Sequence, residues 1–266
     1  MAAPSPAAPT GRVVFVGAGP GSADLITLRG LRALQQAEVV LFDALADPAL
    51  RDYAPGAEWI DVGKRGFSHR PGSDASGQPR INALIVEHAL RGKRVVRLKG
   101  GDPSIFGRLE EELQAAYAAG LECEVVPGVT AALAAAAGTR LPLTRRGTGR
   151  SVTLTTAMTR AGSLQPGEAL AARRDTEVLY MAGKQLAALA EQLLDAGWPS
   201  DTPCSVVSRA GWADQLHTAH CIDSLHEAGE AHAGRPTVVV VGAGARPVPA
   251  ADEISPPSQL TPVNVQ

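Results

Sequence analysis

The sequence predicts an α/β protein of two domains with largely parallel sheets and a ligand cleft between them. Three observations carry this prediction: apolar runs alternate with helical patterns, several runs end in glycine, and the pattern restarts near residue 140. We therefore expect an N-terminal α/β domain over residues 12–140 and a C-terminal α/β domain over residues 141–246. The Pro-rich ends, 1–11 and 247–266, are expected to be disordered.

The first half alternates buried strands with amphipathic helices. Continuous apolar runs such as "RVVFVG" are typical of strands covered on both faces of a parallel sheet. Leu25, Leu28, Leu31 and Leu34 follow at helical spacing, and Ser22 or Asp24 is expected to cap their helix. The same patterns predict strands at 12–17, 38–43, 58–63, 94–101 and 122–128, and helices at 22–37, 80–92, 106–120 and 129–138.

The second half contains five apolar stretches and one clear helical pattern. The helix is expected at 184–197, in "KQLAALAEQLLDAG". Strands are expected at 151–156, 176–183, 203–211, 216–225 and 236–244. We place the junction between the two domains near "GTRLPLTRRGTG".

Composition narrows the possible functions. The chain carries 25 Lys and Arg against 27 Asp and Glu, a balance that argues against a general nucleic-acid binder. No stretch reaches the roughly 18 apolar residues of a membrane span, and no signal peptide is expected. Three scattered cysteines indicate reduced thiols and a cytoplasmic protein. The six histidines show no ligand spacing, so no metal site is expected.

A glycine loop follows the first strand and suggests a dinucleotide enzyme. Gly17, Gly19 and Gly21 lie there, and Asp43 ends the next strand, where a ribose-binding acid would stand. The third glycine comes one place too early, however, and Pro20 has no N–H to offer a phosphate. We keep an NAD-dependent oxidoreductase only as an alternative.

A second loop favours a cationic or neutral ligand. Gly100 and Gly101 let the backbone approach a ligand closely, and Asp102 can accept hydrogen bonds from an amine or a ribose. An acid followed by Pro103 is poorly suited to phosphate, because it adds negative charge and removes a donor. A simple chain reversal remains the alternative for this turn.

Several motifs together resemble the tetrapyrrole methylase family, and in particular its branch that methylates uroporphyrinogen III. They are "VGAGPG…LITLRG", "VVLFDAL", "VGKRG", "GKRVVRLKGGDPSIFGR", "EVVPGVTAALAAAAGTRLPLTRR" and "LYMAG", in order over most of residues 12–245. The resemblance implies the tetrapyrrole methylase fold, with S-adenosyl-methionine bound between two domains of a homodimer. It implies C-methylation of uroporphyrinogen III to precorrin-2, for sirohaem or cobalamin synthesis, with S-adenosyl-homocysteine released and no metal required.

The resemblance also implies roles for particular residues. Asp43 matches the family's proton acceptor and Lys64 its proton donor. The residues that match its methyl-donor site are Pro20, Gly100, Gly101, Asp102, Ile105, Thr130, Ala131, Met181 and Ala210. On this interpretation the loop at 17–21 makes room for the nucleoside and the substrate. Thr130 is alternatively only a helix N-cap, and Met181 only a core side chain.

The chain also departs from the family pattern. The loop "RGFSHRPGSDASGQPRIN" is long, "GRLEEE" lacks a glycine pair, and "TLTTAMTRAG" stands where the family has Thr-Gly-His. These departures bear on the tetrapyrrole more than on the donor. A precorrin methyltransferase of cobalamin synthesis and a non-catalytic tetrapyrrole-binding paralogue therefore remain alternatives.

Overall fold

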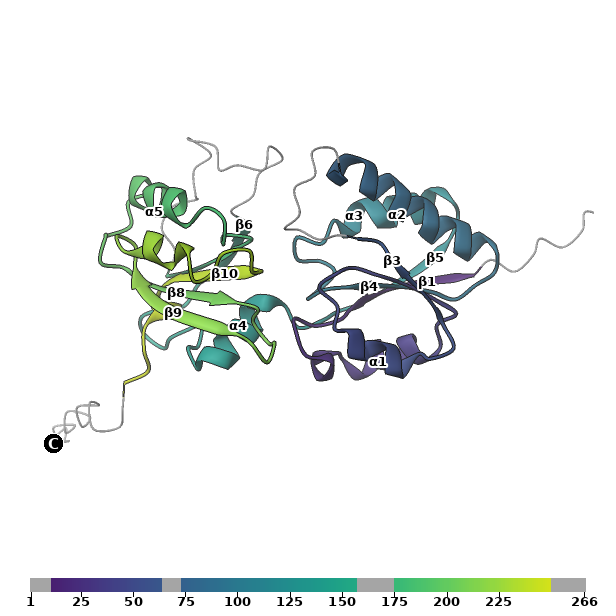
Figure 1. Cartoon of the computed structure of the whole chain (residues 1–266), viewed down its shortest axis with the longest axis horizontal. Helices are drawn as coiled ribbons and strands as arrows, with labels where there is room; N and C mark the ends of the chain where they lie inside the picture. The colour runs from purple at the N-terminus through teal and green to yellow at the C-terminus, as the bar shows by residue number, and fades with distance from the viewer. Residues whose placement is uncertain (1–10, 64–72, 157–174, 250–266) are drawn as a thin grey trace, which may run out of the picture.

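Two five-stranded sheets organise the chain, each covered by helices (Figure 1). The computed structural model describes residues 11–63, 73–156 and 175–249. The expected disordered ends therefore lie almost entirely outside the described residues. Of the long loop expected at 65–82, residues 65–72 also lie outside them, whereas residues 73–82 are helical, so this helix begins earlier than the predicted residue 80.

The first sheet is parallel throughout, as predicted. Its strands run in the order β3-β2-β4-β1-β5. They are β1 (Arg12–Gly17), β2 (Val39–Phe42), β3 (Glu58–Asp61), β4 (Val95–Lys99) and β5 (Glu122–Val126). The helices α2 (Ser73–Leu90) and α3 (Leu109–Ala118) lie on one face, and α1 (Leu28–Gln35) lies on the other (Figure 1). Covering both faces is what the continuous apolar strands require.

The helix α1 begins later than the sequence predicts. Its N-cap is Thr27, whose Oγ1 accepts a hydrogen bond of 3.1 Å from the Gly30 N–H. The expected caps, Ser22 and Asp24, instead belong to a short 3-10 turn, η1 (Ala23–Leu25), and its own N-cap. The start was misplaced because residues that favour the N-cap position precede two separate turns, and threonine is one of them.

The second sheet corrects the expectation of largely parallel strands. Its order is β6-β7-β10-β8-β9, and only β6 and β7 pair in parallel. The β10 strand runs antiparallel to both β7 and β8, and β8 runs antiparallel to β9. The strands are β6 (Val152–Thr156), β7 (Thr176–Tyr180), β8 (Pro203–Ser208), β9 (Leu216–Cys221) and β10 (Thr237–Gly242). The short β8–β9 connection leaves no room for a parallel crossover, which needs a dozen or more residues.

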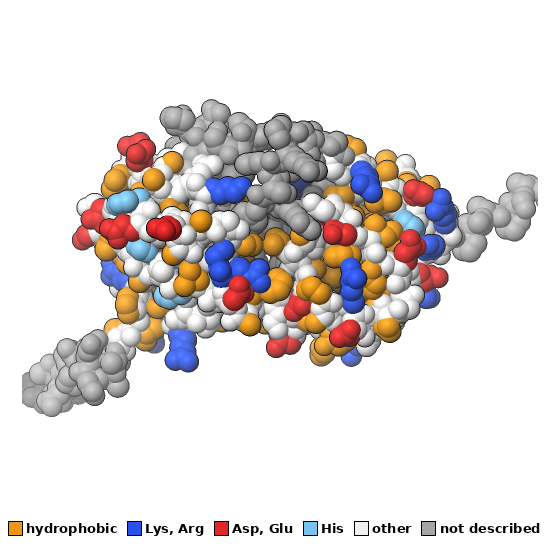
Figure 2. Space-filling model, in the orientation of Figure 1, with side chains coloured by type: hydrophobic (Ala, Val, Ile, Leu, Met, Phe, Trp, Pro, Cys, Tyr) orange, Lys and Arg blue, Asp and Glu red, His pale blue; other side chains and the backbone are white. Residues whose placement is uncertain are grey.

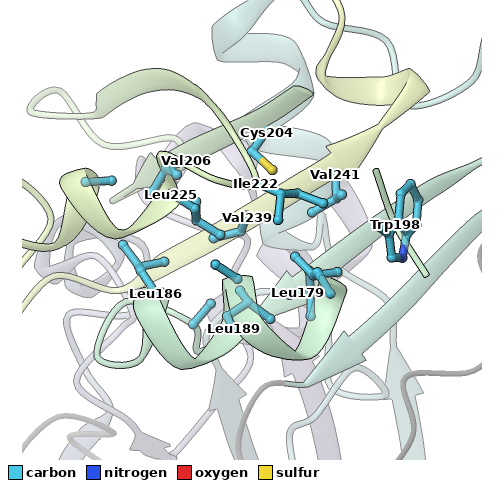
Figure 3. Packing of buried hydrophobic residues seen from close by; sticks show 14 residues of the cluster. Leu179, Leu186, Leu189, Trp198, Cys204, Val206, Ile222, Leu225, Val239 and Val241 are labelled. Atoms are coloured by element: carbon cyan, nitrogen blue, oxygen red, sulfur yellow. The ribbon is translucent and has the colours of Figure 1, made fainter. Parts of the chain in front are cut away.

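The second sheet carries a core of its own on one face. Leu186, Leu189 and Leu193 of α5 (Leu186–Asp195) are buried at helical spacing against the sheet. Figure 3 shows Leu186 and Leu189 facing Leu179, Val206 and other strand residues, with Trp198 to one side of them. The crossover β7-α5-β8 thus seals this face, as the helical pattern at 184–197 predicts.

The opposite face of the second sheet is covered by α4 (Ala131–Thr139), which arrives from the first half of the chain (Figure 1). Ala132 and Ala135 pack there with Val178, Val207 and Val240. The division of the chain at residue 140 stays a prediction, but α4 lies on the second sheet. The remaining short helices are η2 (Pro48–Tyr53), η3 (Leu225–Gly229) and η4 (Ala243–Ala245). Within the described ranges, no helix is long and apolar enough to cross a membrane.

Candidate active site

The loops that follow β1, β4 and β5 contact one another at the carboxyl ends of these strands. Gly19 and Gly101 form an antiparallel bridge, in which the Gly101 N–H donates to the Gly19 carbonyl at 2.9 Å. A Cβ atom on Gly17 would lie 2.6 Å from the Gly128 Cα atom and 2.8 Å from the Gly101 carbonyl oxygen. Because Gly17 has no side chain, the backbone of Gly128 and Gly101 packs directly against the first glycine loop. This packing leaves it no phosphate cradle and counts against the dinucleotide alternative.

Open space lies beside Gly101 instead. Its φ is +74°, and a Cβ built there would meet nothing closer than the Val129 carbonyl oxygen at 3.9 Å. We expected the glycines of the 17–21 loop to make room for the nucleoside. This expectation is corrected, because other parts of the protein occupy the space beside those glycines. The second loop offers the room that a closely approaching ligand needs.

Asp102 holds the second loop to the end of β5. Its Oδ1 accepts from the Ser104 N–H at 2.8 Å, and its Oδ2 accepts from the Gly128 N–H at 2.8 Å. Both oxygens therefore already bond to backbone. The structure assigns Asp102 a bracing role in the turn, beside any hydrogen bond that a ligand adds.

The two halves of the molecule touch at the first glycine loop. The Ser22 N–H donates to the Gly211 carbonyl at 3.0 Å. A Cβ on Gly211 would collide with the Pro20 carbonyl oxygen, so only glycine permits this approach. Pro20 and the buried Ala210 are thereby brought to the same junction.

Tyr180, which the sequence analysis did not single out, links α4 to the end of β7. Its hydroxyl shares a hydrogen bond of 2.7 Å with Thr130 Oγ1 and accepts from the Ala132 N–H at 3.2 Å. Thr130 stands at the N-cap position of α4, but its side chain makes no capping bond. The tyrosine hydroxyl therefore takes over the cap, and its ring lies 5.1 Å from that of Phe106.

Three residues with left-handed backbone lie beside these contacts. Phe106 has a φ of 50° and packs against Tyr180, Met181 follows Tyr180 with a φ of 58°, and Arg209 precedes Ala210 with a φ of 52°. Such conformations are costly outside glycine and cluster at functional sites. Met181 is 38% exposed, which argues against a purely core role.

Asp43 lies at the end of β2 and contacts a buried cluster of charges. Its Oδ2 accepts from Arg97 Nη2 at 3.2 Å, and its Oδ1 accepts from the Gly100 N–H at 3.1 Å. Arg97 Nε donates to Glu112 at 3.1 Å, and Lys99 Nζ donates to the same carboxylate at 2.7 Å. Burial lowers the pKa of Lys99, with the nearby Arg97 charge adding to the effect and Glu112 opposing it.

Most of the predicted site residues meet at this junction, and one lies outside the described residues. Ile105, Ala131 and Ala210 share one apolar cluster with Tyr180. Lys64, the expected proton donor, falls in the segment that the structure does not describe. Figure 2 shows lysine and arginine side chains on the surface near the junction of the two halves. In the described part of the chain, no group of three or more His, Cys, Asp or Glu residues could hold a metal ion.

Residues 12–225 match the family described as Tetrapyrrole (Corrin/Porphyrin) Methylases. The chain belongs to the tetrapyrrole methylase family. It is 40% identical over 253 residues to a uroporphyrinogen-III C-methyltransferase of Pseudomonas aeruginosa, covering 95% of this chain and 99% of that protein. It is 45% identical over 237 residues to siroheme synthase 1 of Yersinia pseudotuberculosis, which covers 87% of this chain but only 48% of that longer protein.

Solved structures of the tetrapyrrole methylase family share the fold. Uroporphyrin-III C-methyl transferase from Thermus thermophilus, complexed with S-adenyl homocysteine, matches with a TM-score of 0.75 and 34% identity, over 88% of this chain and 98% of that one. A cobalt precorrin-4 methyltransferase matches with a TM-score of 0.74 and 30% identity, over 89% of this chain and 96% of that one. The predicted α/β fold of the tetrapyrrole methylases and the predicted family are confirmed, although the strand directions of the second sheet differ from the prediction.

Proposed function

We propose that this chain is an S-adenosyl-methionine-dependent C-methyltransferase that converts uroporphyrinogen III to precorrin-2. The observation that carries the proposal is the open space at Gly101, in a loop that also contains Gly100, Asp102 and Ile105, which match the family's donor site. The extent of the likeness supports this substrate, since the Pseudomonas enzyme is matched over nearly its whole length. A later precorrin methyltransferase is the second candidate, because a cobalt precorrin-4 methyltransferase shares the fold almost as closely.

The residues at the junction fit a nucleoside-bearing donor. Gly101 leaves space, while Ile105, Ala131 and Ala210 supply apolar surface. The donor supplies an electrophilic methyl group on a sulfonium. The chain therefore needs no metal or covalent intermediate, and its main task is to align the methyl with a ring carbon.

Proton handling is the second task, because the tetrapyrrole must lose a proton from elsewhere in its ring system once a ring carbon has accepted the methyl group. Asp43 is proposed as the acceptor: its side chain is 12% exposed, at the carboxyl end of β2, and it is fixed by Arg97 and by the Gly100 N–H. Lys64 remains the proposed donor on the basis of the family motif alone. Asp102, Thr130 and Tyr180 hold the loops on which donor and substrate meet.

We also propose that the protein works as a cytoplasmic homodimer. The family resemblance supports the dimer, and the three free cysteines favour a reducing compartment. Light scattering is expected to give a dimer mass at concentrations where the protein is active. A monomer under those conditions would contradict the assembly.

Incubation with S-adenosyl-methionine and uroporphyrinogen III tests the function directly. Mass spectrometry should detect two added methyl groups and the release of S-adenosyl-homocysteine. Calorimetry should give micromolar-class binding of S-adenosyl-homocysteine, roughly −8 kcal/mol, and weaker binding of NAD. Binding of both ligands without turnover would favour the non-catalytic paralogue, and turnover of a later precorrin alone would favour the second candidate.

A further inference from the structure

Two charged side chains of β4 face the core of the first sheet. Side chains alternate along a strand, and Val96 and Leu98 join the cluster on the α1 face while Val95 joins that of the α2 and α3 face. Arg97 and Lys99 share the face of Val95 and are 0% and 2% exposed. Charges at such positions lose their hydration, so they stay only if every one is paired.

The Arg97 guanidinium is held on three of its sides. Nε donates to Glu112 Oε1 at 3.1 Å, and Nη2 donates to Asp43 Oδ2 at 3.2 Å. Nη1 donates to the carbonyls of Leu98 at 2.8 Å and Leu41 at 3.3 Å. Because the guanidinium is planar, these bonds fix its orientation and with it the direction of its bond to Asp43.

Glu112 anchors the far side of this unit. Its carboxylate, on α3, accepts from Lys99 Nζ of β4 at 2.7 Å and from Gln78 Nε2 of α2 at 3.3 Å, so it joins both helices to the strand. The two cations and two anions balance in charge. Their side chains are 0 to 2% exposed except that of Asp43, which is 12% exposed and reaches the strand end beside Gly100.

We propose that Arg97 and Glu112 are positioning residues that hold the Asp43 carboxylate in register with the Gly100–Gly101 turn. This inference rests on the proposed function and on Asp43 as its proton acceptor. A cluster needed only for stability is served as well by apolar side chains of similar volume. Here the chain of bonds instead ends on the one partly exposed carboxylate. The Gly100 N–H also donates to the Asp43 carboxylate, so the orientation of this carboxylate is tied to the Gly100–Gly101 turn, where the methyl donor is proposed to bind.

The test is a cycle between Arg97→Lys and Asp43→Asn, with Glu112→Gln as a second perturbation. Lysine keeps the charge at position 97 but lacks the planar fork that contacts both carboxylates. Arg94→Lys is the matched control, because Arg94 precedes the same strand and pairs with Glu38 on the surface. For each variant, kcat and KM for both substrates, the S-adenosyl-homocysteine affinity and the melting temperature are measured.

Arg97→Lys is expected to lower kcat about tenfold or more through misplacement of Asp43, with donor affinity and both KM values held within about threefold. In the Asp43→Asn background the same change should alter the residual kcat less than about twofold, because residues that act as a unit are not additive. Arg94→Lys should retain full activity.

Other outcomes separate this inference from the proposed function. Full kcat in Arg97→Lys, or losses that multiply with those of Asp43→Asn, would overturn the positioning role in an otherwise active enzyme. If Arg97→Lys fails to fold, the same cycle is run with Glu112→Gln and Asp43→Asn. The inference is refuted if Glu112→Gln lowers kcat by the same factor in the Asp43→Asn background as in the unsubstituted protein. An unsubstituted chain that transfers no methyl would overturn the proposed function, and this inference with it.

Discussion

Asp43→Asn isolates the acid–base role of one carboxylate, and the structure gives its side effects. Each Asp43 oxygen accepts one hydrogen bond, from Arg97 Nη2 at 3.2 Å and from the Gly100 N–H at 3.1 Å. An asparagine has one acceptor oxygen, so either orientation turns its NH₂ group toward a donor. One buried donor then loses its partner, and Arg97 loses one of its two carboxylates. We expect a cost of about 2 kcal/mol in stability, since an unpaired buried donor costs about 1–3 kcal/mol.

This cost leaves the protein folded at working temperature, while loss of the base is expected to lower kcat by about 100-fold or more. The rate is followed by product mass at saturating substrate, well below the melting temperature. Affinity for S-adenosyl-homocysteine is measured by calorimetry and should stay within about threefold, because the Gly101 space is unchanged. Asp61→Asn is the control: its Oδ1 accepts from the Gly63 N–H at 2.7 Å at the exposed end of β3. An unaltered kcat in Asp43→Asn, or a loss of donor binding in proportion to rate, would refute the reasoning.

Three further predictions address the donor loop, the domain link and the pH response. Gly101→Val should lower donor affinity, measured by calorimetry, by at least about 100-fold. Gly120→Val is the control: the φ values of the two glycines are +74° and +71°, so a valine is similarly strained at both, but donor affinity should fall only at Gly101. Tyr180→Phe leaves the Ala132 N–H unpaired and should cost about 1–2 kcal/mol in urea unfolding, with weaker donor binding. Burial lowers the pKa of His232 from 6.5, so the unfolded chain takes up that proton first. The free energy of unfolding should therefore fall as pH drops below 6.5, with a shallower slope in His232→Gln; equal slopes would contradict this prediction.

The strands β1, β2 and β4 of the first sheet were predictable because burial on both faces gives a continuous apolar run. The run at 12–17 coincides with β1, and Gly100 follows β4 directly. The direction of the strands in the second sheet was not predictable. All six residues of β10 are buried, so its valine run looks like a parallel strand, although both of its neighbours are antiparallel. Burial determines that a strand exists, whereas the connections determine its direction.

The site divides in a similar way between local motifs and distant pairs. Gly100, Gly101 and Asp102 stand together in one loop and could be found from their chemistry. Tyr180 and Arg97 could not, because their partners Thr130 and Glu112 are 50 and 15 residues away in the chain. The signal for Arg97 was present nonetheless: an arginine and a lysine two apart in an apolar run must share one buried face.

The mixed second sheet explains how both halves of the chain reach one site. The β7 and β8 strands each run antiparallel to β10, so they are parallel to each other and end at the same edge. Met181 follows β7 and Ala210 follows β8, so the residues after both strands meet on that edge. Gly211 then contacts the loop after β1, whose sheet also ends there. The loop after β1 thus contacts Gly211 of the second half through Ser22, and it bridges to Gly101 through Gly19. Donor binding is therefore expected to depend on glycines that allow close packing of the backbone, such as Gly211, as much as on Gly101, which leaves room for the ligand.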